Sequence, residues 1–161
     1  MMDENSPTNL KADLRSNSIL FYALITGVIM FLVIIIALIK FAGNFSKVDD
    51  SFGRILLITA SVIATICLIA AFLNYKKVMS QILPGSPLAE RSNIYRSGLI
   101  RFSALCEGAA LFSVIGLFLT GNFWFVLIIA IMLLVMLSKR PTKQRMIDEL
   151  QLNWQEQQQF D

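Results

Sequence analysis

Hydrophobic and polar residues are arranged along the chain in long blocks, and four of these blocks are almost entirely apolar. They cover residues 19–39, 55–73, 99–119 and 123–137. An α-helix needs about 20 apolar residues to cross a hydrocarbon core about 30 Å thick. The first three blocks meet this requirement, and the fourth approaches it when Asn122 and Ser138 sit in the interface. The pattern therefore predicts an all-α fold, a four-transmembrane-helix bundle made of two antiparallel hairpins.

The polar residues that flank the blocks set the limits of the predicted spans. Within one membrane domain, residues 1–161, we place the spans at 19–41, 54–75, 98–120 and 122–138. Apolar residues at helical spacing extend the second helix to residue 83 and start the third near residue 87. A helix from Pro87 to Leu119 is about 50 Å long at 1.5 Å per residue, longer than the hydrocarbon core is thick. The second and third helices should therefore extend beyond the bilayer into the cytoplasm.

Two short segments have the composition of turns between helices. In the Pro84-Gly85-Ser86-Pro87 segment, Ser86 suits a helix N-cap and Pro87 suits the first helical position. Farther along, Gly121 suits the cap that ends the third helix, and Asn122 suits the N-cap of the fourth. This second turn is tight, so the third and fourth helices should be antiparallel neighbours.

The segment 141–157 predicts an amphipathic helix in the cytoplasmic tail. Met146, Ile147, Leu150 and Trp154 fall on one helical face. Such a helix could lie on the membrane, dock on the extended hairpin or bind a partner.

Positive charges predict how the chain is threaded. With four spans, the N-terminal arm, the middle segment and the C-terminal tail share one side of the membrane, and they carry 11 of the 14 Lys and Arg residues. Basic residues favour the cytoplasmic side. We expect a multi-pass protein of the cell membrane (plasma or inner membrane), with both termini in the cytoplasm.

Composition narrows the possible chemistry. The chain is 56% hydrophobic and 16% charged, whereas soluble domains carry about 25% charged residues. It contains no His, which removes histidine metal sites and Ser-His-Asp catalysis in cis. Both cysteines, Cys67 and Cys106, lie inside apolar blocks, where small buried thiols are common. A basic face with stacking aromatic residues is typical of nucleic-acid binding, and the sequence has no such face. We expect no enzymatic activity, no cofactor and no metal.

Glu107 is the one charged residue well inside an apolar block. A carboxylate in that position is costly unless it is neutral, paired or facing water. Ser103, four residues earlier, lies on the same helical face and could hydrogen-bond to it. Three interpretations remain open: a protonated carboxyl that bonds between helices, a group that handles protons or cations, or a group that recognises a ligand or partner.

Small residues recur four apart on two of the predicted helices, which allows membrane helices to approach closely. On the third helix the pairs are Ala104 with Gly108 and Ala109 with Ser113, and on the second the pair is Ala60 with Ala64. They predict packing inside the bundle or, alternatively, an oligomer interface.

The segment 104–113, Ala-Leu-Cys-Glu-Gly-Ala-Ala-Leu-Phe-Ser, resembles the carboxylate helix of the rotor-ring c subunits of rotary ATPases. The resemblance maps the ion-binding Glu of that family onto Glu107 and its aromatic residue onto Phe112. It covers one helix of four, and the glycine-rich partner helix of the family has no counterpart here.

The whole chain is similar to small uncharacterised four-helix bacterial membrane proteins. The similarity lies in Glu107-Gly108, in the Leu-Thr-Gly-Asn turn at 119–122, and in the Arg-Pro-Thr and Asp-Glu-Leu steps at 140–142 and 148–150. It implies a membrane fold and supplies no activity.

Together, these patterns predict a non-enzymatic accessory or structural subunit, or an oligomer-forming membrane protein. Its expected partners are the lipid bilayer and either another membrane protein or a second copy, and no nucleic acid. The alternative is a proton- or cation-translocating protein that uses Glu107. Asn44 begins a formal N-glycosylation sequon, and the sequence leaves open whether Asn44 is glycosylated.

Overall fold

The computed structural model describes residues 10–41, 49–83 and 85–158, and every regular element in these ranges is a helix. The helices are α1 (Leu10–Phe41), α2 (Asp50–Met79), α3 (Leu88–Thr120), α4 (Trp124–Ser138), α5 (Lys143–Leu150) and α6 (Trp154–Gln157). The prediction of an all-helical chain is confirmed. Asn44 lies outside the described residues.

Three of these helices, α1, α2 and α3, are long and apolar enough to cross a membrane. The fourth candidate is α4, whose 15 residues extend only about 22 Å. It passes the same test only together with α5, and the two helices are bent by 68° at the break between them. By length and composition, the described residues therefore contain three helices that could cross a membrane, or four if the bent α4–α5 pair counts as one span.

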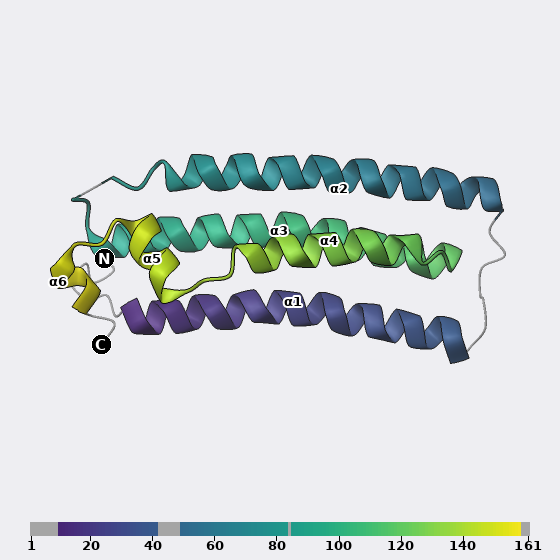
Figure 1. Ribbon diagram of the computed structural model, residues 1–161, viewed down its shortest axis with the longest axis horizontal. Coiled ribbons are helices and arrows are strands. Elements are labelled where there is room, and N and C mark those ends of the chain that lie inside the picture. Colours follow the sequence, from purple (N-terminus) through teal and green to yellow (C-terminus); the bar gives the residue numbers. More distant parts are fainter. Residues whose placement is uncertain (1–9, 42–48, 84, 159–161) are drawn as a thin grey trace, which may run out of the picture.

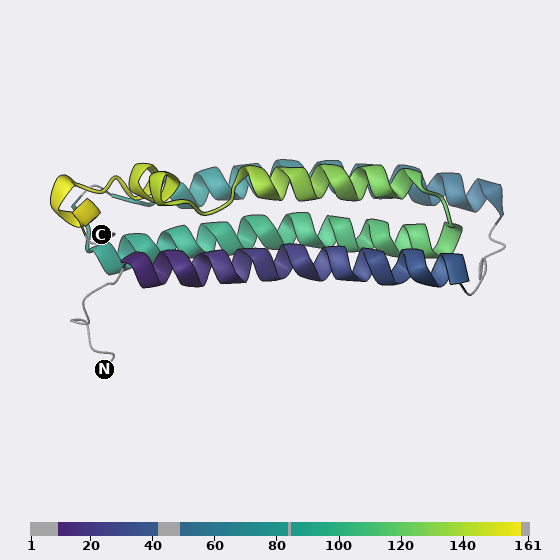
Figure 2. The same cartoon turned by 60° about the horizontal axis from the view of Figure 1, so that its bottom comes forward.

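The four longer helices run alongside one another, and α3 lies at the centre of the arrangement (Figures 1 and 2). It contacts α1, α2 and α4, and α4 also contacts α2. The start of α1, the α2–α3 connection, α5 and α6 gather at one end, which we call the hairpin end. The α3–α4 turn lies at the opposite end, which we call the turn end.

Three clusters of buried side chains follow α3 from end to end, and each is built around a group of α3 residues. Nearest the turn end, Ala109, Ala110, Val114 and Leu117 pack with residues of α1, α2 and α4. In the middle, Leu99, Phe102 and Cys106 do the same. At the hairpin end, Tyr95 packs with Leu10, Ile82, Met146, Leu150 and Leu152. Burial along α3 therefore joins elements that are far apart in the sequence.

The turn between α3 and α4 follows the prediction at Gly121, whereas the N-cap of α4 is Phe123, one residue after the predicted Asn122. Gly121 ends α3 in the left-handed conformation (φ 64°), and its N–H donates to the carbonyl of Leu117 at 2.8 Å. The side-chain oxygen of Asn122 accepts from the backbone N–H of Trp124 at 3.0 Å. Glycine adopts this φ without the steric cost that a Cβ would bring.

The start of α3 differs from the prediction by one residue. Pro87 is the N-cap and the helix begins at Leu88. The Ser86 hydroxyl donates to the carbonyl of Leu83 at 3.0 Å, so it closes the preceding turn and does not cap α3. On the other side of this connection, α2 ends at Met79 and the chain leaves the helix before residue 83.

The tail is two short helices, so the prediction of one helix over 141–157 is wrong. Gln151 has a φ of 51°, which breaks the helical path after α5. Leu152 is then buried in the hairpin-end cluster, and Asn153 starts α6 with a reciprocal capping box to Glu156. Burial of Leu152 and the favourable cap offset the loss of helical bonds at the break.

Candidate functional site

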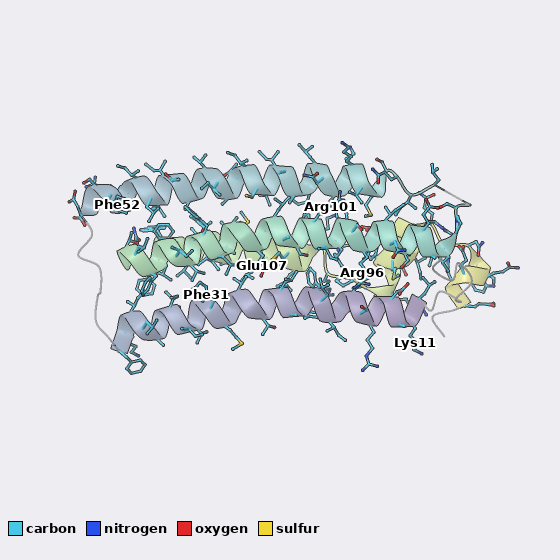
Figure 3. The ribbon with its side chains drawn as sticks, turned by 180° about the vertical axis from the view of Figure 1, so that it is seen from behind. Lys11, Phe31, Phe52, Arg96, Arg101 and Glu107 are labelled. Carbon is cyan, nitrogen blue, oxygen red and sulfur yellow. The ribbon has the colours of Figure 1, made fainter. Side chains whose placement is uncertain are left out.

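Glu107 lies in the middle of α3, between residues of two core clusters. Cys106 packs in the cluster that contains Ile25 of α1, and Ala109 packs in the cluster that contains Val28. The Glu107 side chain is half-buried and lies on the side of α3 that faces α1 (Figure 3). Within the described part of the chain, its carboxylate makes no hydrogen bond or ion pair.

Arg101 is the nearest basic residue to Glu107 on the same helix, but it does not pair with it. Figure 3 shows Arg101 on the side of α3 that faces α2, whereas Glu107 faces α1. The two side chains therefore point away from each other.

Ser103 is fully buried, and its hydroxyl has no hydrogen-bond partner. The structure therefore brings Ser103 and Glu107 to successive turns of α3 without forming the hydrogen bond that their spacing allows. By contrast, the hydroxyl of Ser113 donates to the carbonyl of Ala109 at 3.0 Å.

The small residues divide into two groups. Ala109 and Ser113 on α3, and Ala60 and Ala64 on α2, are buried inside the helix assembly. Ala104 and Gly108 are exposed on α3. A Cβ added to Gly108 would have no atom within 4 Å, so the surface beside it is open.

We call the surface formed by Ala104, Gly108 and the edge of Glu107 the open α3 face. Both small residues of this face are exposed, and Glu107 beside them lies toward α1 (Figure 3). A second helix could approach the α3 backbone closely there, because no bulky side chain stands at positions 104 or 108.

A second set of polar contacts, at the hairpin end, is centred on Arg91. This side chain is only 4% exposed. It donates to the carbonyl oxygens of Ser86 at 3.0 Å and Leu150 at 2.8 Å, and it forms an ion pair with Glu156. One arginine of α3 therefore holds the α2–α3 connection, the end of α5 and the start of α6 together.

The role of Arg91 was not predicted, although the sequence contains a signal for it. Arg91 falls at helical spacing with Leu88, Tyr95 and Leu99, on the face that becomes buried. A charged residue on a buried face needs partners, and the backbone carbonyls and Glu156 supply them.

Two further contacts tie the tail to the long helices. The Tyr75 hydroxyl of α2 donates to the carboxylate of Glu149 in α5, and Arg145 lies 3.7 Å from the same carboxylate. The ammonium group of Lys139 lies 4.6 Å from the centre of the Tyr75 ring, within the range of a cation–π contact. The tail helix α5 is therefore docked on α2 as well as on α3.

No group of three or more His, Cys, Asp or Glu residues that could hold a metal ion occurs in the ranges that the structure describes. Comparison of the chain with protein-family models, curated proteins and solved structures gives no match.

Proposed function

We propose that this chain is a four-span protein of the plasma or inner membrane, with the hairpin end and both termini in the cytoplasm. The charge asymmetry supports this orientation. The segments assigned to the hairpin end carry 11 of the 14 Lys and Arg residues, and cytoplasmic segments favour basic residues. In this orientation α5 and α6 form a small cytoplasmic cap on the helix assembly.

Within this membrane setting, the proposed role is that of a non-enzymatic accessory or structural subunit. It packs through the open α3 face against another membrane protein or against a second copy. The exposure of Ala104 and Gly108 is the observation that carries this proposal. Small residues four apart on a lipid-facing helix permit close helix–helix contact and are enriched in membrane interfaces.

Glu107 fits this role because it borders the same face without a hydrogen-bond or ion-pair partner among the residues that the structure describes. A lone carboxyl facing lipid is unfavourable, and a hydrogen bond to a partner helix would remove much of that cost. Glu107 would then add specificity to a contact whose area comes from its apolar neighbours.

The test compares two glycines that both stand in open space, Gly108 on α3 and Gly27 on α1. Gly108→Leu should abolish association, because the added side chain keeps the partner helix away. Gly27→Leu, the matched control, should leave it intact. Association is measured in lipid nanodiscs by energy transfer between labelled copies, and in native membranes by co-purification of stoichiometric partners.

A result in which Gly108→Leu associates as strongly as the wild type and Gly27→Leu would rule out the open α3 face as the interface. Helical content by circular dichroism confirms that each variant is folded before the comparison is made.

The second candidate function is proton or cation handling by Glu107. Its supporting observation is that the side chain is half-buried, yet its carboxylate has no hydrogen-bond or ion-pair partner within residues 10–41, 49–83 and 85–158. Glu107→Gln keeps the size and removes the charge, so it separates the two functions in proteoliposomes. Loss of ion flux in Glu107→Gln, with association retained, would favour translocation. Absence of ion flux in the wild type, with association retained in the variant, would favour the packing role.

A further inference from the structure

The chain bends sharply between α4 and α5, at a point that we call the elbow (Figures 1 and 2). Residues on both sides of the elbow line a cleft of about 400 Å³. Its lining is entirely polar or charged: Ser138, Arg140, Thr142, Gln144, Arg145, Asp148 and Glu149. A volume of this size falls in the range of small-ligand sites. The apolar run of α4 ends at Leu137, so the cleft opens at the level of the lipid headgroups.

The elbow is held in shape by bonds inside the chain. Arg145 donates through its guanidinium group to the carbonyl of Ser138 at 2.6 Å and to that of Arg140 at 3.4 Å. Its backbone N–H donates to the hydroxyl oxygen of Thr142 at 3.3 Å. Because these contacts fix the 68° bend, little ordering is needed when a ligand enters.

Several of the lining groups are already engaged by these contacts. Glu149 accepts from Tyr75 and lies 3.7 Å from Arg145, so those charges are satisfied. Asp148 accepts a hydrogen bond from Gln144 at 3.1 Å but has no cationic partner among the described residues. The guanidinium group of Arg140 makes no ion pair within the same ranges.

The cleft therefore presents the guanidinium group of Arg140 and the carboxylate of Asp148, and neither has an oppositely charged partner among the described residues. A complementary ligand carries a negative and a positive group close together. We infer that the cleft binds the headgroup of a phosphatidylethanolamine lipid, with the phosphate at Arg140 and the ammonium group at Asp148.

Two features favour a lipid over a free metabolite. The cleft lies at the end of a membrane helix, where lipid headgroups are present at high local concentration. The acyl chains of the lipid can lie along α4, whose outward positions are the large apolar residues Leu127, Ile131 and Leu134. This inference depends on the membrane location of α4 and does not depend on association through the open α3 face.

The experiment measures lipid retention by native mass spectrometry of the purified full chain. Phosphatidylethanolamine, phosphatidylcholine and phosphatidylglycerol with identical acyl chains are added separately. We expect the wild type to retain phosphatidylethanolamine best, because the fully methylated amine of phosphatidylcholine cannot donate a hydrogen bond to Asp148 and phosphatidylglycerol carries no amine.

Two variants divide the site into its halves. Arg140→Gln should weaken retention of all three lipids by about tenfold, the size expected when a charge-assisted bond is lost. Asp148→Asn should weaken phosphatidylethanolamine retention to the level of phosphatidylcholine and leave the other two lipids unchanged. Arg96→Gln removes an exposed cation of α3, away from the cleft, and should leave the retention of all three lipids unchanged.

Equal retention of the three lipids by the wild type, or wild-type retention by Arg140→Gln, would overturn the inference. Soluble phosphoethanolamine serves as a competitor. Displacement of the lipid at equal concentration would show that the acyl chains add nothing, and would overturn the lipid assignment in favour of a free ligand. Self-association of the same samples is scored separately, so a failed lipid experiment leaves the proposed function untouched.

Discussion

Arg91 of α3 and Glu156 of α6 form an ion pair in which the arginine is almost fully buried and the glutamate is 18% exposed. The two residues are distant in sequence, and their contact closes the tail over the hairpin end. The same guanidinium group also donates to backbone carbonyls of the α2–α3 connection and of α5.

Replacing Arg91 with Met should release the tail. Removing one member of a buried network leaves carbonyls and a carboxylate without their donor, at a cost of about 2–4 kcal/mol. Limited trypsin digestion should then cleave faster between Lys139 and Arg145, and the thermal midpoint in detergent should fall. Arg96→Met, on the exposed side of α3, is the control and should match the wild type.

Glu156→Gln should have a smaller effect, about 1 kcal/mol, because Glu156 can reach water and surface ion pairs contribute little. A double-mutant cycle with Arg91→Met gives the coupling energy. A coupling near zero would mean that the backbone carbonyls hold Arg91 and that Glu156 is dispensable.

The buried tyrosines Tyr75 and Tyr95 should respond differently to loss of their hydroxyls. Tyr75→Phe removes the bond to Glu149 and should cost about 1–2 kcal/mol. Tyr95→Phe should be neutral or stabilising, since that hydroxyl has no hydrogen-bond partner in the structure. Thermal unfolding followed by circular dichroism measures both, and an equal loss in the two variants would contradict the assigned contacts.

A pair of glycines on α3 tests which faces of the helix are closed. A Cβ at Gly116 would lie 2.4 Å from Cε1 of Phe125, so Gly116→Ala should destabilise the fold by about 1–3 kcal/mol through overpacking. Gly108→Ala meets open space and should leave stability unchanged or raise it by about 0.5–1 kcal/mol, the gain in helix propensity. Unfolding of both variants in the same detergent gives the comparison.

Ser103→Ala removes a buried hydroxyl that has no partner, so we expect unchanged or higher stability. Thermal unfolding of the variant in lipid is the measurement. A loss above about 1 kcal/mol would mean that the hydroxyl is satisfied in the membrane, with Glu107 one turn away as the first candidate.

The long helices could be predicted because their apolar blocks are continuous and their turns carry Gly121 or Pro87. The sequence could not show which small residues face inward. Positions 104 and 109 are five residues apart, which places them about 140° apart around a helix, so both pairs suit close packing. Only the positions of α1, α2 and α4 around α3 decide that Ala109 is buried and Ala104 is exposed.

The tail was harder to predict because its shape depends on distant partners. The apolar spacing of Met146, Leu150 and Trp154 favours one continuous helix. In the fold, Leu152 joins a cluster with Leu10 and Tyr95, and this burial favours a break at Gln151 over a longer helix. Local periodicity contains no information about such a cluster, since its members come from both ends of the chain.

The central position of α3 has a consequence for how the protein is made. In the proposed membrane orientation, α1 and α2 enter the bilayer first, yet most of their packing surface in the described ranges is provided by α3 and not by each other. During synthesis these two helices therefore stay in the bilayer as separate, unpacked segments until α3 has been made. The third helix is the template on which they assemble, so the folded state becomes accessible only when the ribosome has passed the middle of the chain.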